Sequence, residues 1–63
     1  MIYNNLGIIY KNKEKYEIAE SYYKKSIKLD SKIYEPCNNL ANLYFFQNRY
    51  QDGIFFYNKA VKL

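Results

Sequence analysis

The sequence offers few side chains that could carry out catalysis. It contains no histidine, a single cysteine at Cys37, and six acidic residues that do not pair at a spacing suited to acid–base chemistry. The two glycines, Gly7 and Gly53, fall in stretches with helical patterning, so neither belongs to a loop that could cradle phosphate. One cysteine and no histidine also exclude a disulfide or a Cys/His zinc site within one chain. We therefore expect no enzyme activity, no cofactor and no metal.

Asparagine is the residue type whose spacing does suggest binding chemistry. Asn4 and Asn5 open the run NNLGIIY, and Asn38 and Asn39 open the similar run NNLANLY in the second half of the chain. An asparagine side chain carries both a donor and an acceptor, so a row of them can bond the backbone of an extended peptide. The alternative is that these side chains are solvated or bonded locally, because the chain uses asparagine freely, with eight in 63 residues.

The asparagine pairs belong to an internal repeat that relates the two halves of the chain. When residues 1–29 are aligned with residues 35–63, nine of the 29 pairs are identical, which is more than chance would give. Apolar residues recur at helical spacing within each repeat and are interrupted by polar runs at 11–15 and 47–49. Pro36 lacks an N–H and suits the first turn of a helix. The pattern predicts four helices of about 13 residues in two antiparallel pairs, starting near residues 3, 16, 34 and 50.

The same spacing predicts which side chains face inward. Gly7 and its counterpart Ala41 mark a position that requires a small side chain, because a neighbouring helix approaches closely there. The expected inward residues of the later helices are Tyr16, Ala19, Tyr23, Ile27 and Leu29, then Leu40, Ala41, Leu43 and Tyr44, then Gly53, Ile54, Tyr57, Ala60 and Val61. Neither helix pair can bury its apolar face alone, and about three repeats are usually needed for stability. We therefore expect further repeats or self-association.

The spacing resembles the tetratricopeptide repeat (TPR), a 34-residue helix-turn-helix unit with small and aromatic residues at fixed positions. The matching residues are Leu6, Gly7, Tyr10, Tyr16, Ala19 and Tyr23, followed by Leu40, Tyr44, Tyr50, Tyr57 and Ala60. The departures, none of which removes a structural requirement, are Tyr3 and Cys37 at the Trp position, Ser26 for an Ala and Ser31 for the Pro. The resemblance implies an all-α fold of two antiparallel helix-turn-helix hairpins, repeat one over 1–33 and repeat two over 34–63. Such a unit is the start of a right-handed α-solenoid.

The resemblance also implies a binding surface. In TPR arrays the first helix of each repeat lines a concave groove, and such arrays act as scaffolds that bind a peptide or partner protein there. The groove residues would be Asn4, Asn5, Ile8, Lys11 and Asn12 from repeat one, and Asn38, Asn39, Asn42, Phe45 and Phe46 from repeat two. The NNLGIIYK run is further similar to TPR arms of O-GlcNAc transferase-like proteins, in which groove asparagines hold substrate peptides. A substrate-binding arm of a larger glycosyltransferase, in which Asn5 and Asn39 would hold the substrate peptide, is therefore an alternative.

Two phenylalanine pairs, Phe45–Phe46 and Phe55–Phe56, make the second repeat more apolar than the first. Adjacent residues of a helix point about 100° apart, so one member of each pair cannot face the main core. Clustered exposed aromatic side chains usually mark an interface. This favours packing against a next repeat or a second copy of the chain over a ligand pocket. A structural unit that self-associates is thus another alternative.

The net charge of +4 includes a basic stripe in which Lys25 and Lys28 recur as Lys59 and Lys62. We interpret the stripe as a solvated face of the outer helices and expect no nucleic acid partner, although the charge favours an acidic peptide. No apolar run approaches the roughly 20 residues of a membrane span, so no membrane association is expected. The unpaired thiol and the absence of a signal pattern favour an intracellular, cytoplasmic setting.

Overall fold

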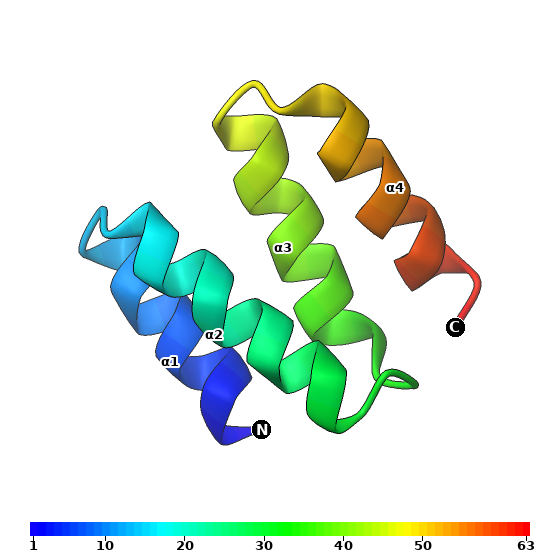
Figure 1. Ribbon diagram of the computed structural model, residues 1–63, viewed down its shortest axis with the longest axis horizontal. Helices are drawn as coiled ribbons and strands as arrows, with labels where there is room; N and C mark the ends of the chain where they lie inside the picture. The colour runs from blue at the N-terminus through cyan, green and yellow to red at the C-terminus, as the bar shows by residue number, and fades with distance from the viewer.

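The computed structural model describes residues 1–63 as four α-helices joined by short turns. The helices are α1 (Ile2–Asn12), α2 (Tyr16–Leu29), α3 (Tyr34–Phe46) and α4 (Tyr50–Val61). α1 and α2 form one antiparallel hairpin, α3 and α4 form a second, and α2 packs against α3 between them (Figure 1). α1 makes a smaller contact with α3. The predicted all-α fold of two hairpins is confirmed.

The core lies around the junction between α2 and α3 and draws on both repeats. Its members are Ala19, Tyr23, Ile27, Cys37, Leu40, Leu43, Tyr44 and Ala60. Tyr23, which is 1% exposed, also fills the space beside α1, because a Cβ atom added at Gly7 would lie 2.5 Å from its Cε1 atom. The predicted close approach at Gly7 is therefore real. Tyr22 adds to the packing of the same hairpin, since its ring stacks with those of Tyr3 and Tyr10.

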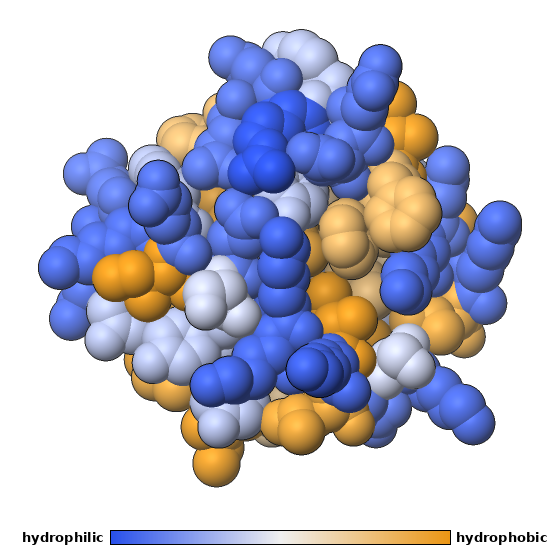
Figure 2. Space-filling view, viewed as in Figure 1, coloured by the Kyte–Doolittle hydropathy of each residue, from blue (hydrophilic) through white to orange (hydrophobic).

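Several side chains that were expected to face inward lie on the surface instead. Leu29 is 71% exposed, and Ile54, Tyr57 and Val61 of α4 are 51%, 48% and 62% exposed. Leu29 is the last residue of α2, and α4 packs against α3 alone, so nothing covers these side chains. The inward prediction is wrong for these four residues. Figure 2 shows apolar side chains exposed among hydrophilic ones on one face of the molecule.

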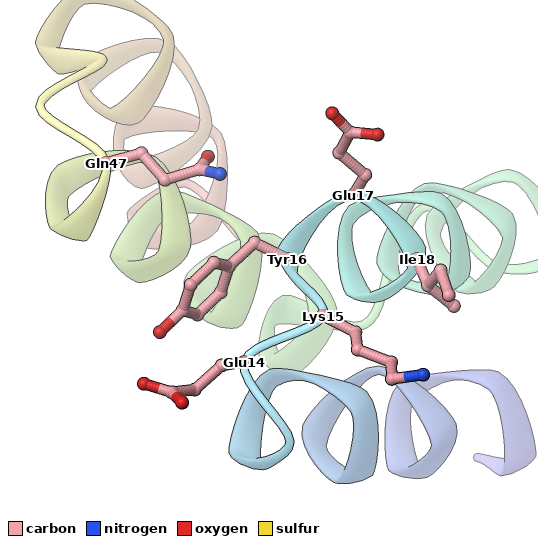
Figure 3. A pocket seen from close by; sticks show the side chains of 6 residues that line it. All are labelled: Glu14, Lys15, Tyr16, Glu17, Ile18 and Gln47. Atoms are coloured by element: carbon pink, nitrogen blue, oxygen red, sulfur yellow. The ribbon is translucent and has the colours of Figure 1, made fainter.

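Both hairpins turn with the same backbone motif. In the first turn, the N–H of Lys15 donates to the carbonyl oxygen of Tyr10 at 2.9 Å. The N–H of Glu14 donates to the carbonyl oxygen of Lys11, also at 2.9 Å, which completes a Schellman motif. Figure 3 shows where this turn lies, with Glu14 and Lys15 labelled between α1 and α2. Equivalent bonds close the second turn. The left-handed residue of the motif is Glu14 in the first turn, with φ 61°, and Asn48 in the second, with φ 62°; asparagine adopts this conformation more readily than glutamate.

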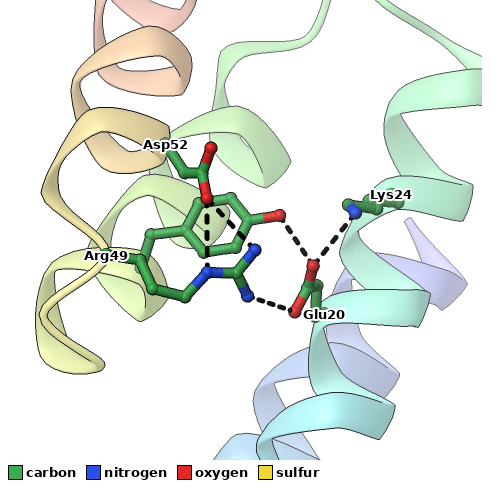
Figure 4. A network of polar contacts seen from close by, with 5 residues as sticks. Glu20, Lys24, Arg49 and Asp52 are labelled. Atoms are coloured by element: carbon green, nitrogen blue, oxygen red, sulfur yellow. Dashed lines mark hydrogen bonds and ion pairs between the residues drawn. The ribbon is translucent and has the colours of Figure 1, made fainter.

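A polar cluster joins the two hairpins at the end where the second turn lies (Figure 4). Glu20 of α2 accepts a hydrogen bond from the Tyr44 hydroxyl at 2.8 Å and pairs with Lys24 at 3.0 Å. Arg49 pairs with Glu20 and with Asp52, each at 3.1 Å, and its guanidinium lies 4.3 Å from the centroid of the Tyr44 ring. We call these five residues the Glu20 network. One carboxylate of the first repeat is thus held by two side chains of the second.

The Glu20 network changes the acidity of its central carboxyl group. Partial burial raises the pKa of Glu20, but hydrogen bonds from Lys24 and Tyr44 and the charges of Lys24 and Arg49 outweigh burial and hold it below the ordinary 4.5. A carboxyl group whose pKa is lower in the folded chain than in the unfolded chain stabilises the fold above the unfolded pKa. That contribution is lost as the pH falls through the folded pKa.

Replacing Gly7 tests the close contact between α1 and α2. We expect Gly7→Ala to lower the free energy of unfolding by about 1–3 kcal/mol, because overpacking against Tyr23 exceeds the roughly 1 kcal/mol gained in helix propensity. The control is Gly53→Ala, whose methyl group would meet the partly exposed ring of Phe45 at 2.9 Å. That ring can move aside, so the control should change stability little. Urea unfolding followed by circular dichroism measures the free energy of unfolding of both variants. Equal losses of stability would contradict a special close contact at Gly7.

A charge-neutral substitution tests the Glu20 network. We expect Glu20→Gln to lower the free energy of unfolding by about 1 kcal/mol at neutral pH, because it removes the charge that Lys24 and Arg49 neutralise. The difference from the unmodified chain should shrink as the pH falls through the lowered pKa of Glu20, below which the carboxyl group is protonated in both states. Urea unfolding over a series of pH values from neutral downward is the measurement. Glu17→Gln, an exposed position of the same helix outside the network, is the control. A loss that does not vary with pH would argue against an ionic role.

Candidate functional site

The four asparagines of the repeated pairs differ in their surroundings. Asn4 is only 3% exposed, and its Oδ1 atom accepts a hydrogen bond from Nδ2 of Asn39 at 3.0 Å. This bond joins α1 to α3. Asn5 is exposed and Asn38 is partly buried, and neither makes a side-chain hydrogen bond within the chain. Part of the predicted amide row is therefore used to hold the hairpins together, whereas Asn5 faces solvent.

The other residues predicted for the groove separate into exposed and packed groups. The exposed residues are Ile8, Lys11 and Asn12 of α1, and Asn42 and Phe46 of α3. Phe46 is 64% exposed, with its ring centroid 5.2 Å from that of Tyr16. Phe45 is partly buried, and its ring would contact any Cβ atom at Gly53, so it lies between α3 and α4.

Six side chains at equivalent helical positions of α1 and α3 form one surface. Five of them are exposed, and Asn39 is partly buried. Residues 5, 8 and 12 of α1 lie three and four positions apart and so share one helix face, as do residues 39, 42 and 46 of α3. We call these six residues the amide stripe. Because the Asn4–Asn39 bond holds the two helices together, the two halves of the stripe lie side by side. The stripe combines four amide side chains with two apolar ones, Ile8 and Phe46.

The second phenylalanine pair has one exposed member and one packed member. Phe55 is 62% exposed, whereas Phe56 is partly buried, with its ring centroid 5.8 Å from that of Tyr44. The rings of Phe55 and Phe56 meet edge to face at 5.1 Å. A shallow hollow beside Phe55 is also lined by Asn58, Lys59 and Lys62, so part of the basic stripe adjoins the aromatic side chain.

A second hollow lies at the tip of the first hairpin. It is lined by Glu14, Lys15, Tyr16, Glu17, Ile18 and Gln47 (Figure 3). The carboxylates of Glu14 and Glu17 point away from each other, so they do not converge on a common reacting atom. The side-chain oxygen of Gln47 is buried without a hydrogen-bond donor. This hollow gathers no set of groups that could act together in catalysis.

The remaining reactive groups do not form a chemical site. Cys37 is fully buried, and burial raises the pKa of its thiol, although the charge of Lys59 partly opposes the effect. A thiol in these surroundings is a poor nucleophile. No three histidine, cysteine, aspartate or glutamate side chains lie close enough to hold a metal ion. None of the four helices has the length and apolar character needed to span a bilayer.

Comparisons with known proteins bear on this arrangement. Residues 1–33 match one family model and residues 34–63 match another, and both models describe a tetratricopeptide repeat. Comparisons with curated proteins and with solved structures give no significant match. Repeats of this family are generally modules for protein–protein interaction. Two consecutive matches and two stacked helical hairpins agree with each other, and the chain belongs to the tetratricopeptide repeat family.

Proposed function

We propose that this chain is a protein-interaction module that binds an extended segment of a partner protein along α1 and α3 and contributes binding rather than catalysis. The observation that carries the proposal is the amide stripe, in which side chains open to solvent occupy equivalent positions of two adjacent helices. A partner segment that crosses both helices would meet amide side chains on each of them.

The amide stripe suits an extended peptide chemically. An extended backbone displays N–H and C=O groups at regular intervals, and each asparagine side chain can bond to either. Asn5 and Asn42 are exposed and retain both their donor and their acceptor groups. Phe46, with most of its ring exposed, offers an apolar contact for one partner side chain. Backbone amide contacts give affinity, and the phenylalanine ring adds a preference for an apolar residue.

Charge favours an acidic partner. The chain carries a net charge of +4, and Lys11, Lys13 and Lys15 follow in the sequence around the C-terminal end of α1, where the stripe ends at Asn12. An acidic segment would therefore be drawn toward this surface, and its association rate would fall as salt screens the attraction.

The glycosyltransferase-arm alternative depends on the same surface. In that alternative, Asn5 and Asn39 are the two side chains that hold a substrate peptide. Asn39, however, is partly buried and already donates one of its two amide N–H groups to Asn4, so it has fewer groups free for a ligand than Asn5 or Asn42. This geometry favours general peptide binding with Asn5 and Asn42 as the principal amide contacts.

Removing the two exposed amides tests the proposal. We expect Asn5→Ala combined with Asn42→Ala to weaken binding of the best acidic peptide from a library about tenfold, because each lost hydrogen bond costs about 0.7 kcal/mol. The substitutions spare the Asn4–Asn39 bond, so the fold should be retained. Fluorescence polarisation is the measurement, and Asn58→Ala on α4 is the control. Binding that is unchanged, or equally weakened by the control, would rule out the amide stripe.

A further inference from the structure

The outer face of α4 repeats a face that α2 buries. Tyr23 and Ile27 of α2 are 1% and 8% exposed; the Tyr23 ring packs against Gly7 of α1, and both residues belong to the core shared with α3. Their counterparts in the second repeat, Tyr57 and Val61, are 48% and 62% exposed. Together with Ile54 on the same side of the helix, we call these residues the α4 face. It is an unpartnered copy of a surface that already has a partner elsewhere in the molecule.

The outer face of α1 repeats a face that α3 buries. Leu43 is 0% exposed and Pro36 is less than 2% exposed, whereas their counterparts Ile9 and Ile2 are 47% and 76% exposed. Each of these helices packs against its own hairpin partner, α1 against α2 and α3 against α4. Packing within a hairpin therefore does not explain why the α3 residues are more buried than their α1 counterparts. The additional burial on α3 comes from the preceding hairpin, mainly from α2 and to a smaller extent from α1. We call Ile2 and Ile9 the α1 face.

The chain therefore carries both halves of one contact. We infer that the α4 face of one copy packs against the α1 face of a second copy, as α2 packs against α3 within each chain. The inference does not rest on the proposed peptide-binding function, since the apolar residues of both faces lie outside the amide stripe; Asn5 alone takes part in both, and the variants below leave it unchanged. Because the two faces differ, the contact is head-to-tail and leaves one face free at each end, so it extends beyond a dimer.

The repeated asparagines supply a polar contact that would set the register of this junction. Within the chain, Asn39 donates to Asn4 across the α1–α3 contact. At the junction between copies, the equivalent residues are Asn5 of the incoming copy and Asn38 of the first. Both side chains are present, and both lack a hydrogen-bond partner within their own chain.

The junction between copies would differ from the internal one in its charge. The counterpart of Glu20 is Ile54, so the carboxylate at the centre of the Glu20 network is replaced by an apolar side chain. The counterpart of Tyr44 is Tyr10, whose ring would then pack against Ile54 instead of bonding to a carboxylate. An apolar junction between chains that each carry +4 should strengthen as salt screens their repulsion.

Two one-sided variants test the inference. Ile54→Lys blocks the α4 face and leaves the α1 face intact, whereas Ile9→Lys blocks the α1 face and leaves the α4 face intact. In sedimentation equilibrium, the unmodified 7.7 kDa chain should show an average mass that rises with concentration past the dimer, and more so at higher salt. Each variant alone should remain a monomer. An equimolar mixture of the two should form a dimer and nothing larger, because only one productive contact remains.

Two further variants serve as controls, and circular dichroism checks that all of them fold. Ile18→Lys changes an exposed isoleucine outside both faces and should leave the association unchanged. Phe55→Lys tests whether the exposed phenylalanine mediates association instead. A monomer at all concentrations, a mixture that fails to dimerise, or association abolished by Phe55→Lys but not by Ile54→Lys would each overturn the inference.

Discussion

The packing of Tyr23 against Gly7 is the contact on which the arrangement of the four helices depends. Without a Cβ atom at Gly7, α1 lies close enough to α2 for the tyrosine ring to fill the space between them. The same ring belongs to the core shared with α3, so one side chain connects the inside of the first hairpin to the junction between hairpins. Because the ring is almost fully buried, a shift of α1 would also disturb the packing of α3.

Those parts of the fold that depend on local sequence could be predicted from it. The internal repeat, the polar turns and the small residue at position 7 predicted four helices in two hairpins, as observed. Leu40, Ala41, Leu43 and Tyr44 were expected to be buried, and they are. α3 lies between two other helices, so an apolar residue on either of its covered sides is buried.

Burial and side-chain pairing that involve residues distant in the sequence could not be predicted in the same way. Helical periodicity shows which side of α4 is apolar, but it does not show whether another element covers Ile54, Tyr57 and Val61. The pairing of Glu20 with Arg49 spans 29 positions, and the repeat gave no indication of it because Ile54 replaces the glutamate in the second copy. Repeat symmetry is informative only where both copies have the same neighbours.

The burial of Cys37 has a practical consequence. The only thiol of the chain lies in the core between the hairpins, and burial keeps it largely protonated at neutral pH. A thiol reagent can therefore reach it only when α3 separates from its neighbours. The labelling rate, divided by the rate for a free cysteine under the same conditions, gives the equilibrium constant for that opening. The protein thus contains its own probe of how often α3 separates from the helices packed around it.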